Sequence, residues 1–464
     1  MDEDLWFAGV AGQAAAVADG TVSSRDLVAA TLERIQRLDG RLDAFTVVTA
    51  QRALAEAAAR DAQRDDRGPL HGVPVAVKEE LDVAGEVTTF GGRANRTPKA
   101  DDGEVVRRLR AAGAVIVGKT NMPEFGQWPF TESGAHGITR NPWDTGRSPG
   151  GSSGGTAAAV AAGLVPAALG GDGGGSIRIP ASFCGLFGLK PQRGRVTTAP
   201  AAHLWWALGT AGPLTRSVLD SALVYDVVRG AAPGDRFRAG RDHAGFVDAA
   251  RQRPGTLRVG FTTKAATPGV RPDPEHVRAV RDTAALLESL GHRVEEVRPR
   301  FPDITAAFVP QFLGGVRAEA DIVERPELLE RRTRHALVAG RWVTPRVVEW
   351  AMRRGEQVAE RANQVFDSCD VLLTPVTPHR PPEVGVLDGV GLVGAALRSL
   401  PVIAYTALWN VAGNPAASVP AGFATDGLPL AVQLVGRTDD EATLLGLSAQ
   451  LEEARPWAQA RPAS

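Results

Sequence analysis

A strand-helix-strand pattern between residues 73 and 117 limits the folds open to this chain more than any other feature. Residues 73–78 form an apolar run that ends at Lys78, and residues 114–117 form a second one. Between them, residues 104–112 place Val105, Val106 and Leu109 on one helical face. Because a helix between two strands usually connects parallel neighbours, this segment predicts two parallel strands of one sheet.

Further strands and helices are expected over the whole length of the chain. The predicted strands cover residues 257–261, 371–374, 417–420 and 430–434. The predicted helices cover residues 24–38, with Ser24 as its cap, 51–64, 274–290 and 441–453. Residues 156–169 are rich in alanine and predict a buried helix and its exit. Since no linker separates these elements, we predict one α/β domain over residues 1–464, with a central mixed, mostly parallel β-sheet flanked by helices.

Composition excludes several classes of protein. With 464 residues, 44% of them hydrophobic, the chain can bury a large core, and a net charge of −1 gives no field that would attract nucleic acid or a membrane surface. Cys184 and Cys369 are far apart and lack metal-ligand spacing. The acidic start and the absence of a long apolar run argue against a secretory signal or a membrane span. We therefore expect a cytoplasmic monomer or homodimer without metal, cofactor, nucleic-acid or membrane partner.

Two serines lie in glycine-rich segments 24 positions apart. Ser152 lies within residues 149–155, and Ser176 lies within residues 170–178. Glycines leave the main chain free to adopt unusual conformations and leave its N–H groups open to a ligand. Such segments suit a hydroxyl nucleophile beside an oxyanion pocket. Either segment alone could be an ordinary tight turn.

A serine nucleophile needs a base, and Lys78 is the best candidate upstream of the two serines. The sequence holds only five lysines, at positions 78, 99, 119, 190 and 264, among 52 basic residues. Arginine stays protonated in proteins, whereas a lysine among apolar groups and hydroxyls can lose its proton. Lys78 closes an apolar strand, which favours that role.

Two short motifs suggest other functions. Residues 113–120 match the phosphate-loop pattern, but the four residues that should form its flexible cradle are Ala-Val-Ile-Val and predict a strand. Residues 150–154 match the nucleophile elbow of α/β-hydrolases, which would make Ser152 part of a Ser-Asp-His triad. That triad needs a downstream histidine, and no candidate has a sequence context typical of a catalytic loop. The candidates are His203, His243, His276, His292, His335 and His379.

These segments resemble the amidase signature family, and the resemblance covers nearly the whole chain. Besides Lys78 and the two serine segments, the matching stretches are residues 118–121, 140–144, 183–191, 374–375, 414–422 and 427–433. The nearest likeness is to small actinobacterial amidases of broad specificity. The resemblance implies a catalytic signature core at residues 66–200. Residues 236–367 match least and are expected to form a variable region that covers the substrate.

The resemblance also implies a mechanism. Ser176 would be the nucleophile, Ser152 would follow a cis peptide bond from Gly151, and Lys78 would be the terminal base. Backbone N–H groups would hold the oxyanion, and further residues would support the loop or accept from the substrate N–H. The oxyanion donors are Gly173, Gly174, Gly175 and Ser176, the supporting residues are Ser153, Asp172 and Arg178, and the acceptor is the Gly126 carbonyl.

The sequence departs from the family pattern near two of these residues. Glu79 follows the lysine where the family usually has aspartate. Gly171 and Gly173 stand where many members have threonine. We expect the two extra glycines to loosen the oxyanion loop or to leave room for a bulkier acyl group.

Aromatic residues are the candidates for the substrate pocket, namely Phe125, Trp128, Phe130, His203, Trp205 and Trp206. This set carries no obvious charge, so it favours neutral, apolar or aryl amides, with aryl esters and carbamates as further candidates. The same residues could instead be ordinary core. The resulting hypothesis is a hydrolase that cleaves the C–N bond of linear amides with water through an acyl-enzyme. Alternatives are the glutaminase-type subunit of a tRNA-dependent amidotransferase and a binding module that has lost catalysis.

Overall fold

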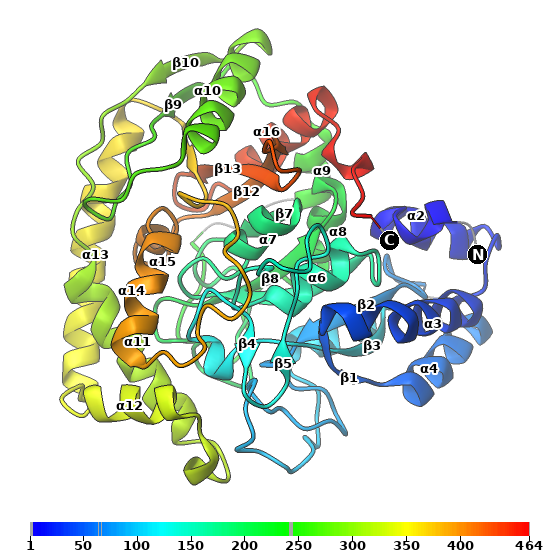
Figure 1. Cartoon of the computed structure of the whole chain (residues 1–464). Coiled ribbons are helices and arrows are strands. Elements are labelled where there is room, and N and C mark those ends of the chain that lie inside the picture. Colours follow the sequence, from blue (N-terminus) through cyan, green and yellow to red (C-terminus); the bar gives the residue numbers. More distant parts are fainter. Residues whose placement is uncertain (1–2, 64, 66, 241–244, 464) are drawn as a thin grey trace.

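One large sheet with helices on both faces organises the molecule (Figure 1). The computed structural model describes residues 3–63, 65, 67–240 and 245–463. Within those residues the sheet has eleven strands in the order β1-β3-β2-β6-β8-β7-β12-β13-β11-β9-β10. The predicted single α/β domain is confirmed. No helix in the described ranges is long and apolar enough to cross a membrane.

The part of the sheet nearest the N-terminus contains the predicted parallel unit. Its strands are β1 (Phe45–Val48), β3 (Val115–Thr120), β2 (Pro74–Lys78) and β6 (Ala167–Asp172). Helix α5 (Glu104–Ala111) connects β2 to β3, and β2 pairs in parallel with both β3 and β6. The strand-helix-strand prediction is therefore confirmed, and the carboxyl ends of β2 and β6 lie at the same edge of the sheet.

The rest of the sheet is largely antiparallel, so the prediction of a mostly parallel sheet is wrong. The remaining strands are β8 (Thr210–Thr215), β7 (Phe187–Lys190), β12 (Ala416–Phe423), β13 (Pro429–Gly436), β11 (Val371–Pro375), β9 (Arg258–Phe261) and β10 (Arg293–Glu296). Across the described sheet, six of the ten neighbouring pairs are antiparallel. The reason is visible at β12 and β13, which a short turn connects directly, whereas a parallel pair needs a long crossover.

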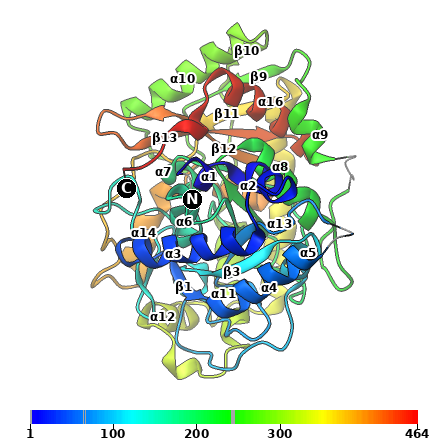
Figure 2. The ribbon, with the colours of Figure 1, turned by 90° about the vertical axis from the view of Figure 1, so that its right-hand side faces the viewer.

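Helices cover the two faces and the edges of the sheet, and Figure 2 shows α3 and α4 beside β1 and β3. The helix at residues 24–38 is found as α3, but Ser23 rather than Ser24 is its cap, because Ser23 Oγ accepts from the Asp26 N–H at 3.0 Å. The helices other than α5 are α1 (Glu3–Trp6), α2 (Gly9–Ala18), α3 (Ser24–Leu42), α4 (Ala50–Ala62), α6 (Gly154–Ala161), α7 (Arg178–Cys184), α8 (Val218–Val228), α9 (Phe246–Arg251), α10 (Pro274–Ser289), α11 (Thr305–Ala320), α12 (Arg331–Ala339), α13 (Pro345–Asn363), α14 (Leu392–Val402), α15 (Ala407–Ala412) and α16 (Glu441–Ala454).

The alternation of side chains along β2 decides where its last residue points. Val75 and Val77 belong to one core cluster, and Ala76 belongs to another that includes the alanines of α6. Because successive residues of a strand face opposite sides, Lys78 faces the same side as Ala76. Helix α6 is buried along its whole length, as the alanine-rich sequence predicts, although the run beyond residue 166 continues as strand β6 rather than as a loop.

Candidate active site

Three chain segments meet at the edge where β2 and β6 end. Lys78 ends β2, Ser152 lies two residues before α6, and the glycine-rich loop with Ser176 follows β6. Parallel neighbouring strands bring their carboxyl ends together, and ligands of α/β proteins commonly bind at such an edge. The pattern of the sheet therefore places all three candidate residues in one region.

Lys78 and Ser152 are in direct contact. Lys78 Nζ donates a hydrogen bond to Ser152 Oγ at 2.8 Å, and both side chains are buried. The peptide bond between Gly151 and Ser152 is cis, which confirms what the family resemblance implied. A buried amine bonded to a hydroxyl can exchange a proton with it without competition from bulk water.

Ser176 lies on the loop between β6 and α7. Its side chain is half-buried, and its hydroxyl makes no hydrogen bond to any described residue. The preceding Gly175 has φ of 131°, a conformation that favours glycine. Ser176 Oγ is thus a hydroxyl without a fixed partner, whereas Ser152 Oγ is held by Lys78. No hydrogen bond joins the two hydroxyls in the described part of the chain, so the Ser176 end of the relay remains a proposal.

The glycine loop offers fewer free backbone N–H donors for an oxyanion than the sequence suggests. Gly175 N–H donates to Asp172 Oδ1 at 2.7 Å, so its assignment as an oxyanion donor is not met in this structure. The N–H groups of Gly173, Gly174 and Ser176 have no hydrogen-bond acceptor within the described chain. A side chain at Gly173 would meet nothing within 4 Å, which agrees with the expected open space there.

Asp172 and Arg178 hold this loop from beneath. Both are fully buried, and the guanidinium donates two hydrogen bonds to the carboxylate, at 3.0 and 2.9 Å. Burial alone would raise the pKa of Asp172, but the charge and hydrogen bonds of Arg178 and the amide of Asn410 lower it well below its usual value. Arg178 also bonds to Thr406, Asn410 and Gln433, so all five of its N–H groups are used. The pair contacts the loop and supports it structurally.

The space at Gly171 is not open to an acyl group. A Cβ atom there would overlap the Glu80 carboxylate, which lies 3.2 Å from Lys78 Nζ. The expectation of additional room is therefore wrong at Gly171, because a tertiary contact fills it. The expected surroundings of Lys78 are corrected as well, since a carboxylate lies beside the amine in addition to apolar groups and hydroxyls.

Glu79, the other departure from the family pattern, serves a separate ion pair. Its carboxylate lies 3.2 Å from Lys119 Nζ, and both side chains are fully buried. Lys119 belongs to the segment that matches the phosphate-loop pattern, but that segment is strand β3. Residues 115–120 of this segment consequently form strand β3, and Lys119 forms a structural ion pair rather than part of a phosphate cradle.

The six aromatic pocket candidates divide into three groups. Trp128 and Trp205 pack on Phe312 of α11, with ring centroids at 6.3 and 5.1 Å, and Phe125 belongs to the same core cluster as Trp205. His203 stacks on Trp206 at 4.3 Å. Phe130 shares a core cluster with Trp128 and packs against residues in and near α14. Phe125, Trp205 and Trp206 have positive φ, which is uncommon for bulky residues and concentrates at functional sites.

Phe308 and Phe312 of α11 were not among the predicted pocket residues. The ring of Phe308 lies 3.6 Å from where a Cβ of Gly174 would be, and it stacks on Phe312. Helix α11 therefore lies over the glycine loop. It falls in the segment 236–367 that was expected to cover the substrate, and the position of these two aromatic residues within that segment is the only signal the sequence offers for them.

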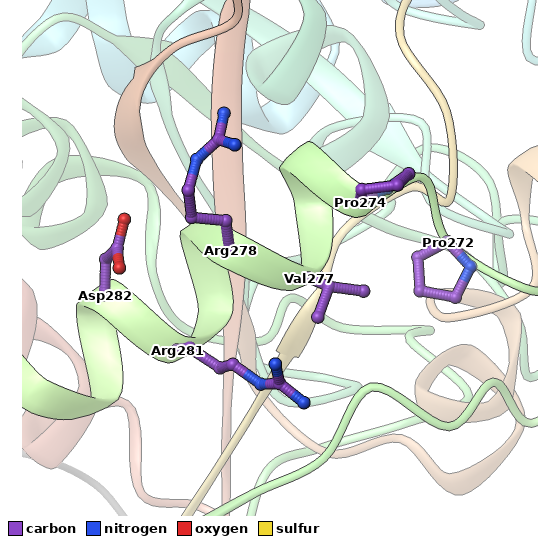
Figure 3. Close-up of a pocket in the computed structure, with 6 residues that line it drawn as sticks. All are labelled: Pro272, Pro274, Val277, Arg278, Arg281 and Asp282. Carbon is purple, nitrogen blue, oxygen red and sulfur yellow. The ribbon is translucent and has the colours of Figure 1, made fainter.

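Two further pockets lie outside this arrangement. One, of about 240 Å³, has a lining that includes Phe130, Phe183, Pro401 and Val402. The other, of about 420 Å³, runs along α10, where Arg278 and Arg281 point to different sides of the helix (Figure 3). Because α10 flanks the opposite end of the sheet from β2, the second pocket is separate from the site.

Histidine chemistry is not supported at either serine. Ser152 Oγ is bonded to Lys78, and in the described ranges no histidine hydrogen-bonds to Ser152 or Ser176. Among the proposed downstream histidines, His292 bonds to Gln450 and His379 to Asp273. His243 lies outside the described residues. The contacts around Ser152 favour a lysine base over a Ser-Asp-His triad.

Glu124, beside Phe125 and Gly126, gives the fold a testable pH dependence. Burial raises its pKa to about 7, and Glu330 N–H donates to its carboxylate at 2.9 Å. A carboxyl group whose pKa is raised by folding contributes stability at low pH that is lost as the pH rises through about 7. We expect Glu124→Gln to raise the free energy of unfolding by on the order of 1–3 kcal/mol at pH 8.5, and to change it little at pH 5.

Urea unfolding of both proteins at the two pH values measures this difference. Glu360→Gln, at an exposed position on α13, is the matched control and should show no pH-dependent difference. Equal stabilisation by Glu124→Gln at both pH values would contradict a buried protonated carboxyl group.

Comparison with known proteins extends these observations. A family model described as Amidase matches residues 26–445. The chain is 48% identical over 464 residues to "Putative amidase AmiB2" of Mycobacterium tuberculosis, covering 99% of this chain and 98% of that protein. It superposes on the structure of 6-aminohexanoate cyclic dimer hydrolase with a TM-score of 0.92 and 34% identity, covering 98% and 99% of the two chains. A bacterial aryl acylamidase gives a TM-score of 0.86 and 28% identity over 97% of each chain.

Proposed function

This chain belongs to the amidase family, and from that premise we propose that it hydrolyses neutral linear amides through an acyl-enzyme on Ser176. The observation that carries the proposal is the 2.8 Å hydrogen bond from Lys78 Nζ to Ser152 Oγ. In the nearby loop, the N–H groups of Gly173, Gly174 and Ser176 have no acceptor among the residues that the structure describes. Hydrolysis of an amide needs a nucleophile, a base and an oxyanion site. In this proposal Ser176 is the nucleophile, Lys78 is the base that acts through Ser152, and the loop N–H groups form the oxyanion site.

In the proposed acylation step, Ser176 Oγ attacks the amide carbon while its proton passes to Ser152, whose own proton passes to Lys78. The oxyanion accepts from N–H groups of Gly173, Gly174 and Ser176. Collapse of the intermediate breaks the C–N bond, and the proton returns through Ser152 to the leaving amine. Water then attacks the acyl-enzyme by the same route and releases the acid.

The proposed substrates are apolar or aryl amides. Phe308 lies over the glycine loop and stacks on Phe312, and Trp205 packs on Phe312. An uncharged aromatic cluster therefore lies beside the loop that carries Ser176. Solved relatives named as an aryl acylamidase and as a cyclic dimer hydrolase support amide substrates without a common charged group. The glutaminase-type subunit is the alternative, and it would require recognition of the charged ends of glutamine.

A substrate panel tests this proposal. The purified chain is assayed with an anilide, an aliphatic amide, an aryl ester, an aryl carbamate, the 6-aminohexanoate cyclic dimer and glutamine. We expect the anilide to exceed glutamine in kcat/KM by at least about a hundredfold, because glutamine would leave its charges unpaired in an apolar pocket. Preference for glutamine or another charged amide would reject the substrate class.

Mass spectrometry tests the nucleophile separately. A slowly hydrolysed aryl carbamate should add one acyl group to the wild-type chain, on the peptide that contains Ser176. The Ser176→Ala variant is the control and should remain unmodified. Modification of both proteins at another residue would reject Ser176 as the acylated group.

A further inference from the structure

A carboxylate beside the base extends the relay. We propose that Glu80 acts as a positioning residue whose carboxylate stabilises the ammonium form of Lys78, and that Gly171 makes room for it. This inference rests on the proposed function, since it assigns a partner to the base of that mechanism. The sequence pattern does not reveal that Glu80 lies beside the base. The inference gives Glu80 a role in setting the pH range of activity.

The contact is close and largely removed from water. Glu80 Oε1 lies 3.2 Å from Lys78 Nζ, and the two side chains are 10% and 1% exposed. Exposed ion pairs contribute little because water screens them, whereas a desolvated pair interacts strongly. Lys78 Nζ thus has Ser152 Oγ on one side and a carboxylate within ion-pair distance on another.

Gly171 is required by this carboxylate and not by the backbone. Its φ is not among the positive values that favour glycine. A Cβ at position 171 would overlap Glu80 Oε1, while the nearest atom outside Glu80 is Leu204 Cδ2 at 3.5 Å. Any larger residue would therefore have to displace the carboxylate from its place beside Lys78.

The surrounding charges leave Glu80 as the carboxylate closest to the amine. Glu319 of α11 faces Glu80, and burial raises its pKa to about 8, with the charges of Glu80 and Asp82 adding to the effect. Burial therefore favours the neutral form of Glu319 near pH 7. Asp82 pairs with Lys99 at 3.5 Å. The flanking strands carry two closed ion pairs, Lys119 with Glu79 and Arg178 with Asp172.

The carboxylate affects the proton transfer without taking the proton itself. In acylation, the proton that leaves Ser176 and passes through Ser152 turns the Lys78 amine into an ammonium beside Glu80. The new positive charge is stabilised where it forms, much as the aspartate of a Ser-His-Asp triad stabilises an imidazolium. When the C–N bond breaks, the proton returns to the amine nitrogen and the Lys78–Glu80 contact returns to its starting state.

Glu80→Gln tests the inference through the pH profile. We expect the acidic limb of the pH profile of kcat/KM to move to lower pH by about one unit. A nearby carboxylate favours the charged form of an amine, and the variant lacks that carboxylate. We also expect the plateau to fall at least about tenfold, because the weaker base stabilises the transition state less. Glu86→Gln, on the same loop and paired with Arg52, removes an equal charge and should leave the limb in place.

Gly171→Ala provides a second variant that leaves Glu80 in the sequence. Its methyl group should displace the carboxylate, so the limb should move in the same direction as in Glu80→Gln. The double variant should show no further movement, because both changes remove one contact. Additive movement of the limb would overturn the role of Gly171.

A direct readout does not depend on catalysis. With five lysines, a chain labelled with ¹³C at lysine Cε gives few signals, and Lys78→Met identifies that of Lys78. In Glu80→Gln, the pH midpoint of this signal should fall by about one unit. An unchanged midpoint would overturn the inference even if amidase activity is found. Failure of every amide in the panel would reject the proposed function, while the midpoint would still decide whether Glu80 controls Lys78.

Discussion

Lys78→Met is expected to lower kcat/KM for an aryl amide by about 10⁴-fold, the size of effect seen when one member of a catalytic triad is removed. Methionine has a similar length, so it fills the buried volume at the end of β2 but cannot accept a proton. Ser152 Oγ loses its 2.8 Å partner at the same time. Initial rates with wild-type and variant protein at several pH values measure the loss.

Lys78→Arg is the matched control for this prediction. Arginine places a permanent positive charge beside Glu80, because it stays protonated and cannot act as a base. A base at position 78 predicts that both variants are equally inactive. Activity of the arginine variant within tenfold of wild type would mean that position 78 supplies only charge. Unchanged melting temperatures would separate either result from a loss of folding.

Arg178→Met is expected to give the largest loss of stability. It leaves the fully buried Asp172 carboxylate without its cation, and removing one partner of a buried ion pair costs about 3–5 kcal/mol. Asn410, Gln433 and the Thr406 carbonyl lose a hydrogen bond as well. Chemical unfolding monitored by circular dichroism measures the change in free energy.

Two comparisons make the result on Arg178 specific. Arg353→Met, at an exposed position of α13, should change the free energy of unfolding by less than about 0.5 kcal/mol. The double variant Asp172→Asn with Arg178→Met should be more stable than Arg178→Met alone, because no uncompensated charge remains. A loss below about 1 kcal/mol in the single variant would contradict a supporting role for this pair.

Local patterns were sufficient to predict the elements that surround the candidate site. The apolar run ending at Lys78 and the alanine-rich helix both occur and are buried at every position, as their continuous apolar sequences require. The helix at 104–112 also occurs, and it buries the face that carries Val105, Val106 and Leu109. The direction of the strands far from this unit was not predictable in the same way. Strands β12 and β13 are antiparallel neighbours joined by a turn. When each strand is predicted separately from its own residues, the prediction does not say whether a turn or a crossover joins it to the next strand.

The site residues were accessible through sequence motifs, but their partners were not. Glu80 occupies the space over Gly171, and this contact depends on how the segment after β2 approaches β6. Gly175 N–H bonds to Asp172, three residues earlier, through a turn of the glycine loop that the motif does not specify. Phe308 and Phe312 escaped prediction because α11 contains Pro310 and two glycines, which weaken its helical pattern in the sequence.

The adjacency of β2 and β6 also has a kinetic meaning for folding. The hydrogen bond between Lys78 and Ser152 spans 74 positions of the chain, and it joins the end of β2, which pairs with β6, to the segment before α6. Contacts of such long range form late, because the intervening chain must first be closed into a loop. We therefore expect the proposed amidase activity to return in a refolding chain only when the sheet is complete, and far-ultraviolet dichroism to recover earlier with the helices.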